Sequence, residues 1–149
     1  MNNKATRIIG VVILVIILAL AGYYYNRNYR VSHPTKTVAE QGKAISGFPQ
    51  DLIMYPNGAV ETSYSLNYGT TQQYTATFNT TKVMSLEWLI YRDYLNHNGY
   101  YIANQNVNEA TNLANLYGTK DNIDVNIVIQ RRADKKSSDV TISYVVKGK

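Results

Sequence analysis

Hydrophobic and polar side chains alternate with a period of two along four stretches of the chain. Two of these stretches, residues 60–68 and 73–79, come early and are separated by a short polar turn. The other two, residues 123–130 and 140–147, come late and carry mainly Ile and Val on one face. Alternation of this kind is typical of half-buried β-strands, so the pattern predicts two β-hairpins.

The alternation also assigns each side chain of these strands to one of two faces. In the first strand it places Val60, Thr62, Tyr64, Leu66 and Tyr68 inward. The outward positions carry short, uncharged polar groups, which can hydrogen-bond without the desolvation cost of a charge. This outward face is our candidate for contact with a protein partner or a glycan, and an ordinary solvated sheet face is the alternative. It consists of Ser63, Ser65, Thr75, Thr77, Asn126, Gln130, Thr141 and Ser143.

Between the two hairpins, the hydrophobic period changes to that of an α-helix. Met84, Trp88, Tyr91 and Leu95 follow one another at spacings of four, three and four residues, which places them on one stripe. Gly99 stands where the helix would end, because glycine readily adopts the left-handed conformation that closes a helix. The pattern predicts one helix here, with the tryptophan in the core.

Two weaker strand-like segments, "YYIANQNV" and "NLANLYG", follow the predicted helix. The order of elements is then β-β-α-β-β-β-β. Such an order favours an α+β fold in which an antiparallel sheet of about five to six strands carries one helix on one face. The predicted fold class is this sheet preceded by an N-terminal transmembrane helix.

The N-terminal segment "IIGVVILVIILALA", residues 8–21, is the basis for that helix. Eleven of its residues are Ile, Leu or Val and none is charged, which favours insertion into lipid. Extended to residue 25, the stretch reaches about 27 Å as a helix, close to the hydrocarbon thickness of a bilayer. We therefore predict a single-pass signal-anchor followed by side chains typical of a membrane interface. These are Tyr23, Tyr24, Tyr25, Arg27, Tyr29 and Arg30.

Two alternatives to an uncleaved anchor follow from the same segment. A cleaved signal peptide would use Lys4 and Arg7 as its basic start, with cleavage after Ala21. A lipoprotein signal would need cysteine after Gly22, and the chain contains no cysteine. The tail before the apolar run is short, which resembles a signal-anchor whose following domain is translocated. The expected location is the cell membrane, with the C-terminal domain extracytoplasmic.

Length and charge divide the chain into three parts. Residues 1–25 are the predicted anchor, residues 26–46 are a polar tether that contains Pro34, and residues 47–149 form one α+β domain. All ten acidic residues and all but two of the fifteen Lys and Arg residues lie after Tyr25, so the exposed part is only mildly basic. This balance does not imply a nucleic-acid partner.

The sequence contains no recognisable catalytic or metal-binding motif. His97 follows Asp93 by one helical turn and could act as a base oriented by a carboxylate, but a solvated histidine in the last turn of a helix is the simpler interpretation. His33 is the only other histidine, so zinc is not expected. Asp121 and Asp124 flank a predicted turn and form no recognisable pair. We expect no cofactor, no metal and no enzymatic activity.

The segment "RRADKKSSD", residues 131–139, places four cations around a predicted hairpin turn. A charged turn is usually only solvated. Contact with an anionic surface, such as lipid headgroups or wall polymers, is the functional alternative. The residues concerned are Arg131, Arg132, Lys135 and Lys136.

Three segments, "FPQDLIMYPNGAV", "YTATFNTT" and "SLEWLIYRDYLNHNGYYI", together resemble a known type of domain. They are similar to a small α+β domain of uncharacterised bacterial envelope proteins, which are tethered to the membrane by a signal-anchor or a lipid. Tyr100 stands where that family usually has Trp. The resemblance runs from residue 47 to the C-terminus and implies a location and a fold, with no activity attached. The matching residues are Phe48, Pro49, Tyr55, Pro56, Gly58, Ala59, Phe78, Thr80, Tyr91, Leu95 and Gly99.

The sequence therefore predicts a membrane-anchored, extracytoplasmic binding or scaffold module that contributes to an envelope-associated protein assembly. Its expected partners are the membrane and a protein but no nucleic acid, while a small-molecule or glycan ligand stays open. A pilin-like filament subunit, which also joins an apolar N-terminal helix to an antiparallel sheet, is the alternative. Against it, the apolar run lacks the glutamate of such subunits, and the first acidic residue is Glu40. An enzyme of unknown reaction is the third possibility.

Overall fold

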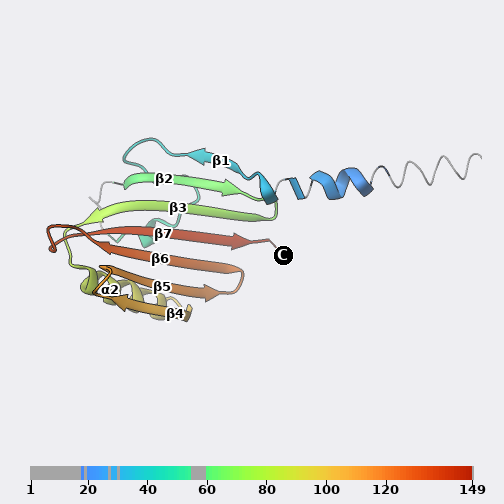
Figure 1. Ribbon diagram of the computed structural model, residues 1–149. Helices are drawn as coiled ribbons and strands as arrows, with labels where there is room; N and C mark the ends of the chain where they lie inside the picture. The colour runs from blue at the N-terminus through green and yellow to red at the C-terminus, as the bar shows by residue number, and fades with distance from the viewer. Residues whose placement is uncertain (1–17, 19, 27, 30, 55–59, 149) are drawn as a thin grey trace, which may run out of the picture.

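The computed structural model describes residues 18, 20–26, 28–29, 31–54 and 60–148. In this part of the chain, seven strands form one sheet in the order β1-β2-β3-β7-β6-β5-β4, accompanied by a 3-10 helix, η1, and an α-helix, α2 (Figure 1). The elements are β1 (Thr35–Val38), η1 (Gln50–Leu52), β2 (Val60–Asn67), β3 (Thr71–Thr80), α2 (Met84–His97), β4 (Tyr101–Asn108), β5 (Leu113–Lys120), β6 (Ile123–Arg131) and β7 (Ser138–Lys147).

Two groups of consecutive strands meet at the centre of the sheet. β1, β2 and β3 form one meander, β4, β5, β6 and β7 form the other, and every neighbouring pair is antiparallel. α2 connects β3 to β4, which lies at the far edge, so that β7 returns beside β3 (Figure 1). β3 and β7 are each ten residues long and pair along their whole length, which makes them the centre of the fold.

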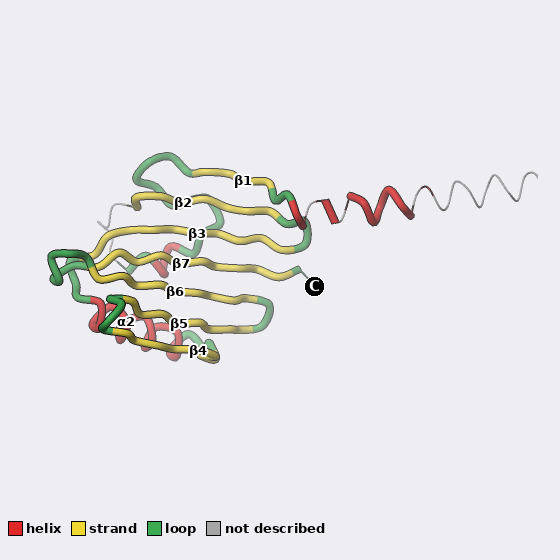
Figure 2. The backbone as a smooth tube through the Cα atoms, viewed as in Figure 1, coloured by secondary structure: helices red, strands yellow, loops and turns green. Residues whose placement is uncertain are grey.

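One face of the sheet is covered by α2 and by the segment between β1 and β2 that contains η1 (Figure 2). The Tyr91 hydroxyl donates a hydrogen bond to the carbonyl oxygen of Leu52 at 3.0 Å, so α2 is tied directly to η1. Burial of large apolar side chains between these layers is the main source of stability in a fold of this kind. The strands contribute Ala76, Phe78, Ala114, Leu116, Val125, Ile127, Ile129, Val140 and Ile142 to this core.

α2 lies in the stretch whose period predicts a helix, but its buried stripe is turned slightly from the predicted one. Glu87 is fully buried, whereas Trp88 is half-buried at the edge of the core, with the guanidinium of Arg92 5.0 Å from the centroid of its ring. The Thr80 hydroxyl donates to Glu87 Oε1 at 2.5 Å, which satisfies one oxygen of this buried carboxyl group. The buried residues of α2 are Met84, Glu87, Tyr91 and Leu95.

β2 contains a β-bulge at Glu61 that reverses the faces of the strand. Val60 pairs with Phe78, but Thr62 pairs with Thr77, so the residues after the bulge are shifted by one position. A shift of one residue moves every following side chain to the other face. The predicted inward set of this strand is therefore wrong after its first residue. The bulge turns Ser63 and Ser65 to the covered face, and Thr62, Tyr64 and Leu66 to the opposite face.

The predicted number of strands is wrong as well, because the sheet has seven. The additional strand is β1, which lies inside the segment of residues 26–46 where the polar composition predicts a tether. All four residues of β1 are exposed, so no alternation of apolar and polar side chains marks this strand in the sequence. Pairing with β2, rather than burial, defines it.

The fold class also needs correction at the N-terminus. In the described part of the chain, no helix is long and apolar enough to span a membrane. The predicted transmembrane helix over residues 1–25 falls largely on residues 1–17 and 19, which lie outside the described residues.

Candidate functional site

The face of the sheet opposite α2, called the open face below, carries no helix in the described part of the chain (Figure 1). At its centre, the pairing of β3 with β7 brings four hydroxyl side chains together. The Oγ1 atoms of Thr77 and Thr141 lie 3.1 Å apart, and Oγ1 of Thr75 lies 3.4 Å from Oγ of Ser143. These four residues form the hydroxyl row. Because the two longest strands hold it in register, the row is rigidly placed.

The hydroxyl row is closely surrounded, although no helix covers it. Thr75 is only 4% exposed, since its neighbours within the sheet enclose it. The side-chain amide of Gln73 donates to Thr75 Oγ1 at 3.2 Å, and Tyr64 of β2 pairs directly with Thr75. A hydroxyl group that takes part in one such bond keeps further lone-pair capacity. The row can therefore accept hydrogen bonds from a partner without losing its internal ones.

Apolar and aromatic side chains flank the hydroxyl row on both sides. Tyr64 and Leu66 stand on β2, and Val128 on β6 lies opposite Thr141 of β7. The Lys36 ammonium lies 4.6 Å from the centroid of the Tyr64 ring, a cation–π contact that holds this tyrosine from the β1 side. A mixture of aromatic, aliphatic and short polar groups is the composition found at protein–protein interfaces.

Charged groups lie at one end of the open face and are neutralised locally. Lys147 Nζ lies 2.6 Å from Asp124 Oδ2, which joins β7 to β6. A hydrogen bond to Asp124 raises the pKa of the Tyr117 phenol above its usual value, and a hydrogen bond to the same carboxylate raises the pKa of Lys147. Tyr117 is therefore a neutral donor at physiological pH.

The other end of the open face also carries charged groups. The side-chain amide of Asn79 donates to Glu61 Oε1 at 2.7 Å, and Arg132 Nε lies 3.5 Å from Asp139 Oδ1. The hydroxyl row between the two ends is itself neutral. A partner that docks on this centre does not need a strong charge of either sign.

The structure separates the predicted partner face into two sets. Thr75, Thr77, Thr141 and Ser143 form the hydroxyl row, and Asn126 and Gln130 of β6 lie exposed on the same face. Ser63 and Ser65 do not belong to it, because they are 2% and 8% exposed on the covered face.

Ser63 has a structural role instead. Its Oγ accepts a hydrogen bond from the backbone N–H of Ile45 at 3.0 Å and donates to the carbonyl oxygen of Thr75 at 2.8 Å. Sequence reasoning missed Tyr64 and Leu66 on the open face, since nothing in the composition of β2 marks the bulge.

The end of β6 and the turn that joins it to β7 carry the four predicted cations and are called the basic tip below. Two of its positive charges are neutralised by ion pairs. Arg131 forms an ion pair with Glu109, and Arg132 pairs with Asp139. Lys135 and Lys136 are exposed in the turn, where Asp134 Oδ1 accepts from the backbone N–H groups of Lys136 at 2.9 Å and Ser137 at 3.0 Å. The Ser137 hydroxyl and these two N–H groups lower the pKa of Asp134.

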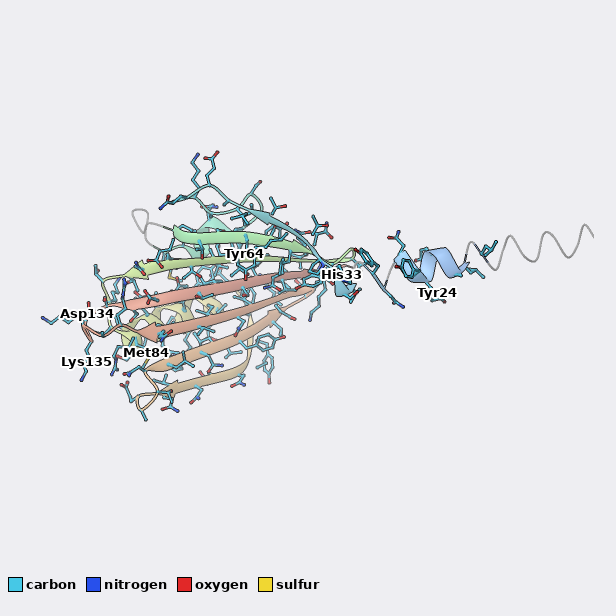
Figure 3. The ribbon with its side chains drawn as sticks, turned by 45° about the horizontal axis from the view of Figure 1, so that its top comes forward. Tyr24, His33, Tyr64, Met84, Asp134 and Lys135 are labelled. Atoms are coloured by element: carbon cyan, nitrogen blue, oxygen red, sulfur yellow. The ribbon has the colours of Figure 1, made fainter. Side chains whose placement is uncertain are left out.

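The position of the tip also bears on the predicted anionic contact. Asp134 and Lys135 lie at the opposite end of the molecule from Tyr24 and His33 of the N-terminal segment (Figure 3). One flat membrane therefore cannot contact both ends at once. Of the four predicted cations, Lys135 and Lys136 stand outside the described ion pairs, and contact of the tip with an anionic surface stays a prediction.

The candidate catalytic pair is not assembled. His97 Nδ1 lies 2.7 Å from the backbone carbonyl oxygen of Asp93, while the Asp93 carboxylate pairs with Arg92 at 3.2 Å. The other histidine, His33, stacks on the Tyr29 ring with centroids 4.4 Å apart. Among the described residues, no group of three or more His, Cys, Asp or Glu side chains could hold a metal ion.

A cluster of tyrosines lies on the covered side, beside the C-terminal half of α2. The Tyr94 hydroxyl donates to Asp51 Oδ2 in η1, and the ring centroids of Tyr74 and Tyr144 lie 6.4 Å apart. Burial raises the pKa values of Tyr94, Tyr100 and Tyr144, and the negative charge of Asp51 adds to each shift. These phenols stay protonated at neutral pH and therefore do not serve as bases.

The predicted membrane-interface side chains are only partly described. Tyr23, Tyr24, Tyr25 and Tyr29 lie on helical residues and are at least half exposed. The rings of Tyr25 and Tyr29 stack with centroids 6.2 Å apart. The two arginines of the set, Arg27 and Arg30, lie outside the described residues.

Comparisons of the chain with models of protein families, with curated proteins and with solved structures find no match. The resemblance of residues 47–149 to bacterial envelope domains therefore stays an expectation from the sequence. Evidence for a function comes from the open face and its surroundings.

Proposed function

We propose that the chain is a protein-binding module that docks its partner on the open face. One observation carries the proposal: a broad sheet face that no described helix covers presents a neutral hydroxyl row flanked by Tyr64, Leu66 and Val128. An antiparallel sheet needs only one buried face to be stable, so the other is available for contact.

The physical properties of the face favour a protein partner. Its central polar groups already hydrogen-bond to one another, so little desolvation cost arises when a partner excludes water. Its side chains stand on paired strands rather than on loops, and binding therefore costs little conformational entropy. Aromatic and aliphatic side chains beside the row supply apolar area for the contact.

We further propose that the module works at the cell envelope, in association with a membrane. The apolar sequence of residues 8–21 and the exposed tyrosines after it support this location. Fractionation of cells into membrane and soluble fractions tests it. The full chain should sediment with the membranes, and recovery in the soluble fraction would contradict the proposed location.

The binding role can be tested because the chain contains no cysteine. A single cysteine introduced as Asn126→Cys on the open face, labelled with a photo-crosslinker in native membranes, should give a discrete adduct of higher mass. Asn96→Cys on the exposed side of α2 is the matched control and should not give this adduct.

A second pair of variants tests the same face without labels. Asn126→Lys with Gln130→Lys places two charges on the open face, and Ser85→Lys with Asn96→Lys adds the same charge to the exposed side of α2. We expect the first pair to remove co-purification of the adduct-forming partner and the second pair to preserve it. The proposal would be contradicted if substitutions on the open face and on α2 gave equal adducts, or if both pairs of lysine variants co-purified the partner equally.

A further inference from the structure

The two edges of the sheet differ in how their backbone groups are protected. β4 forms one edge, is eight residues long and, among the described strands, pairs only with β5 (Figure 2). Its sequence, YIANQNVN, has no charged residue and no proline, and every residue except Ile102 is exposed. An edge strand of this length and composition leaves backbone N–H and C=O groups ready to pair with another strand.

β1 forms the other edge and has the usual protections. It is four residues long, follows Pro34 directly and carries Lys36. Short length, proline and lysine are devices that prevent pairing at an edge. The contrast leaves β4 as the one edge of this sheet that can accept a strand along a long, neutral stretch.

A β-bulge in β4 confines the regular part of the edge to its C-terminal half. Ile102 pairs with Gly118, but Asn104 pairs with Tyr117, so the register shifts at Ala103. From Asn104 to Asn108 the pairing is continuous. In this stretch, Asn104, Asn106 and Asn108 share the open face, and Gln105 and Val107 share the other.

We infer that β4 pairs antiparallel with β4 of a second copy of this chain, so that one continuous sheet runs through a symmetric dimer. The edge is neutral, so two copies approach without like-charge repulsion. Its asparagine and glutamine amides both donate and accept hydrogen bonds, which makes the edge complementary to itself. A charged peptide from another protein finds no opposite charge on this strand.

The protected β1 edge explains why such pairing would stop at two copies. Antiparallel pairing of one strand with itself is isologous and uses the same surface on both copies. Each dimer would then expose only its two β1 edges, which resist further pairing. The product is closed, in contrast to the fibre expected when both edges of a sheet are free.

This inference is independent of the proposed function, because it uses the backbone of an edge and not the side chains of the open face. The inferred dimer and the proposed binding of a protein partner can therefore be contradicted independently of each other. A dimer that binds no protein partner leaves the inference intact, and a monomer that binds one leaves the proposed function intact.

The first experiment measures the mass of the full chain in detergent by size-exclusion chromatography with light scattering. The wild type should have the mass of two chains. Asn104→Lys with Asn106→Lys should give one chain, because two lysines from each copy would then face each other. Thr35→Lys with Thr37→Lys places the same charge on the β1 edge and should preserve the dimer. A wild-type monomer, or a dimer that survives the β4 substitutions, overturns the inference.

The second experiment does not depend on disrupting the strand. Single cysteines are placed in turn at positions 104, 105, 106 and 107, and at Thr37 as the control. Cysteines form a disulfide when their Cα atoms lie about 4.4 to 6.8 Å apart, which near a symmetry axis holds only at the axis itself. Crosslinking should therefore peak sharply within the β4 series and be absent at Thr37. A flat profile, or equal crosslinking at Thr37, overturns the inference.

Discussion

Phe78 and Thr77 are neighbours in β3, yet they point to opposite faces of the sheet and have different surroundings. Phe78 is completely buried in the core on the covered face, together with Ile142 of β7. Thr77 is half-buried on the open face and hydrogen-bonds to Thr141. The difference teaches that one face provides most of the stability through apolar burial, while the other provides small local bonds and stays available for contact.

Truncation of the two neighbours should give the largest contrast. Phe78→Ala removes a fully buried ring and should lower the free energy of unfolding by about 3–5 kcal/mol. Thr77→Ala removes one half-buried hydrogen bond and should cost about 1 kcal/mol. Urea unfolding followed by Trp88 fluorescence measures both. Losses of similar size would mean that the open face is as important for stability as the covered face.

Polar contacts should also differ between the faces. Thr80→Val removes the hydroxyl that donates to the buried Glu87 carboxyl group and should cost about 1–3 kcal/mol. Thr62→Val is the matched change at an exposed position of the open face and should stay within about 0.5 kcal/mol. Thr80→Ser should recover most of the loss, because it restores the hydroxyl. A Thr80→Val protein as stable as wild type would show that Glu87 does not depend on this donor.

The hydroxyl row itself can be tested with a double-mutant cycle. Thr77→Val and Thr141→Val keep the side-chain shape and remove the two hydroxyls of one pair. We expect the two changes to be coupled by about 0.5–1.5 kcal/mol, because each single variant leaves the other hydroxyl without its cross-strand partner. Additive effects in urea unfolding would indicate that the two hydroxyls bond to water instead, and that the row is wetter than the structure indicates.

The smallest effect should come from the tyrosine cluster, and only at high pH. Tyr94, Tyr100 and Tyr144 have pKa values above the usual phenol value, so the folded state holds their protons more tightly than the unfolded state. Their contribution is complete below about pH 10 and is lost as the pH rises further. The thermal midpoint should fall above that pH, and Tyr94→Phe should make the decline shallower. An unchanged pH profile in Tyr94→Phe would assign the decline to other groups.

Several features of the candidate site could be predicted from the sequence, because strong alternation marks them. Thr75, Thr77, Thr141 and Ser143 belong to strands in which buried Ile, Val, Ala or Phe occupies every second position, so their face follows from the pattern. Ser63 and Ser65 were assigned to the wrong face, because the bulge at Glu61 leaves no mark in the composition of β2. The same bulge places Tyr64 and Leu66 on the open face, although the alternation predicts them inward.

The sequence by itself determined the central strands and the position of α2, since both depend on local periodicity and on the burial of large apolar side chains. Only the tertiary structure decided the features that depend on pairing between distant segments. These are the inclusion of β1 in the sheet, the pairing of β3 with β7 that forms the hydroxyl row, and the location of β4 at an unprotected edge. The burial of Glu87 also depends on Thr80, which lies at the end of β3 and donates a hydrogen bond to its carboxyl group. Each depends on which strand or side chain lies beside another in space, and one-dimensional periodicity carries no information about that choice.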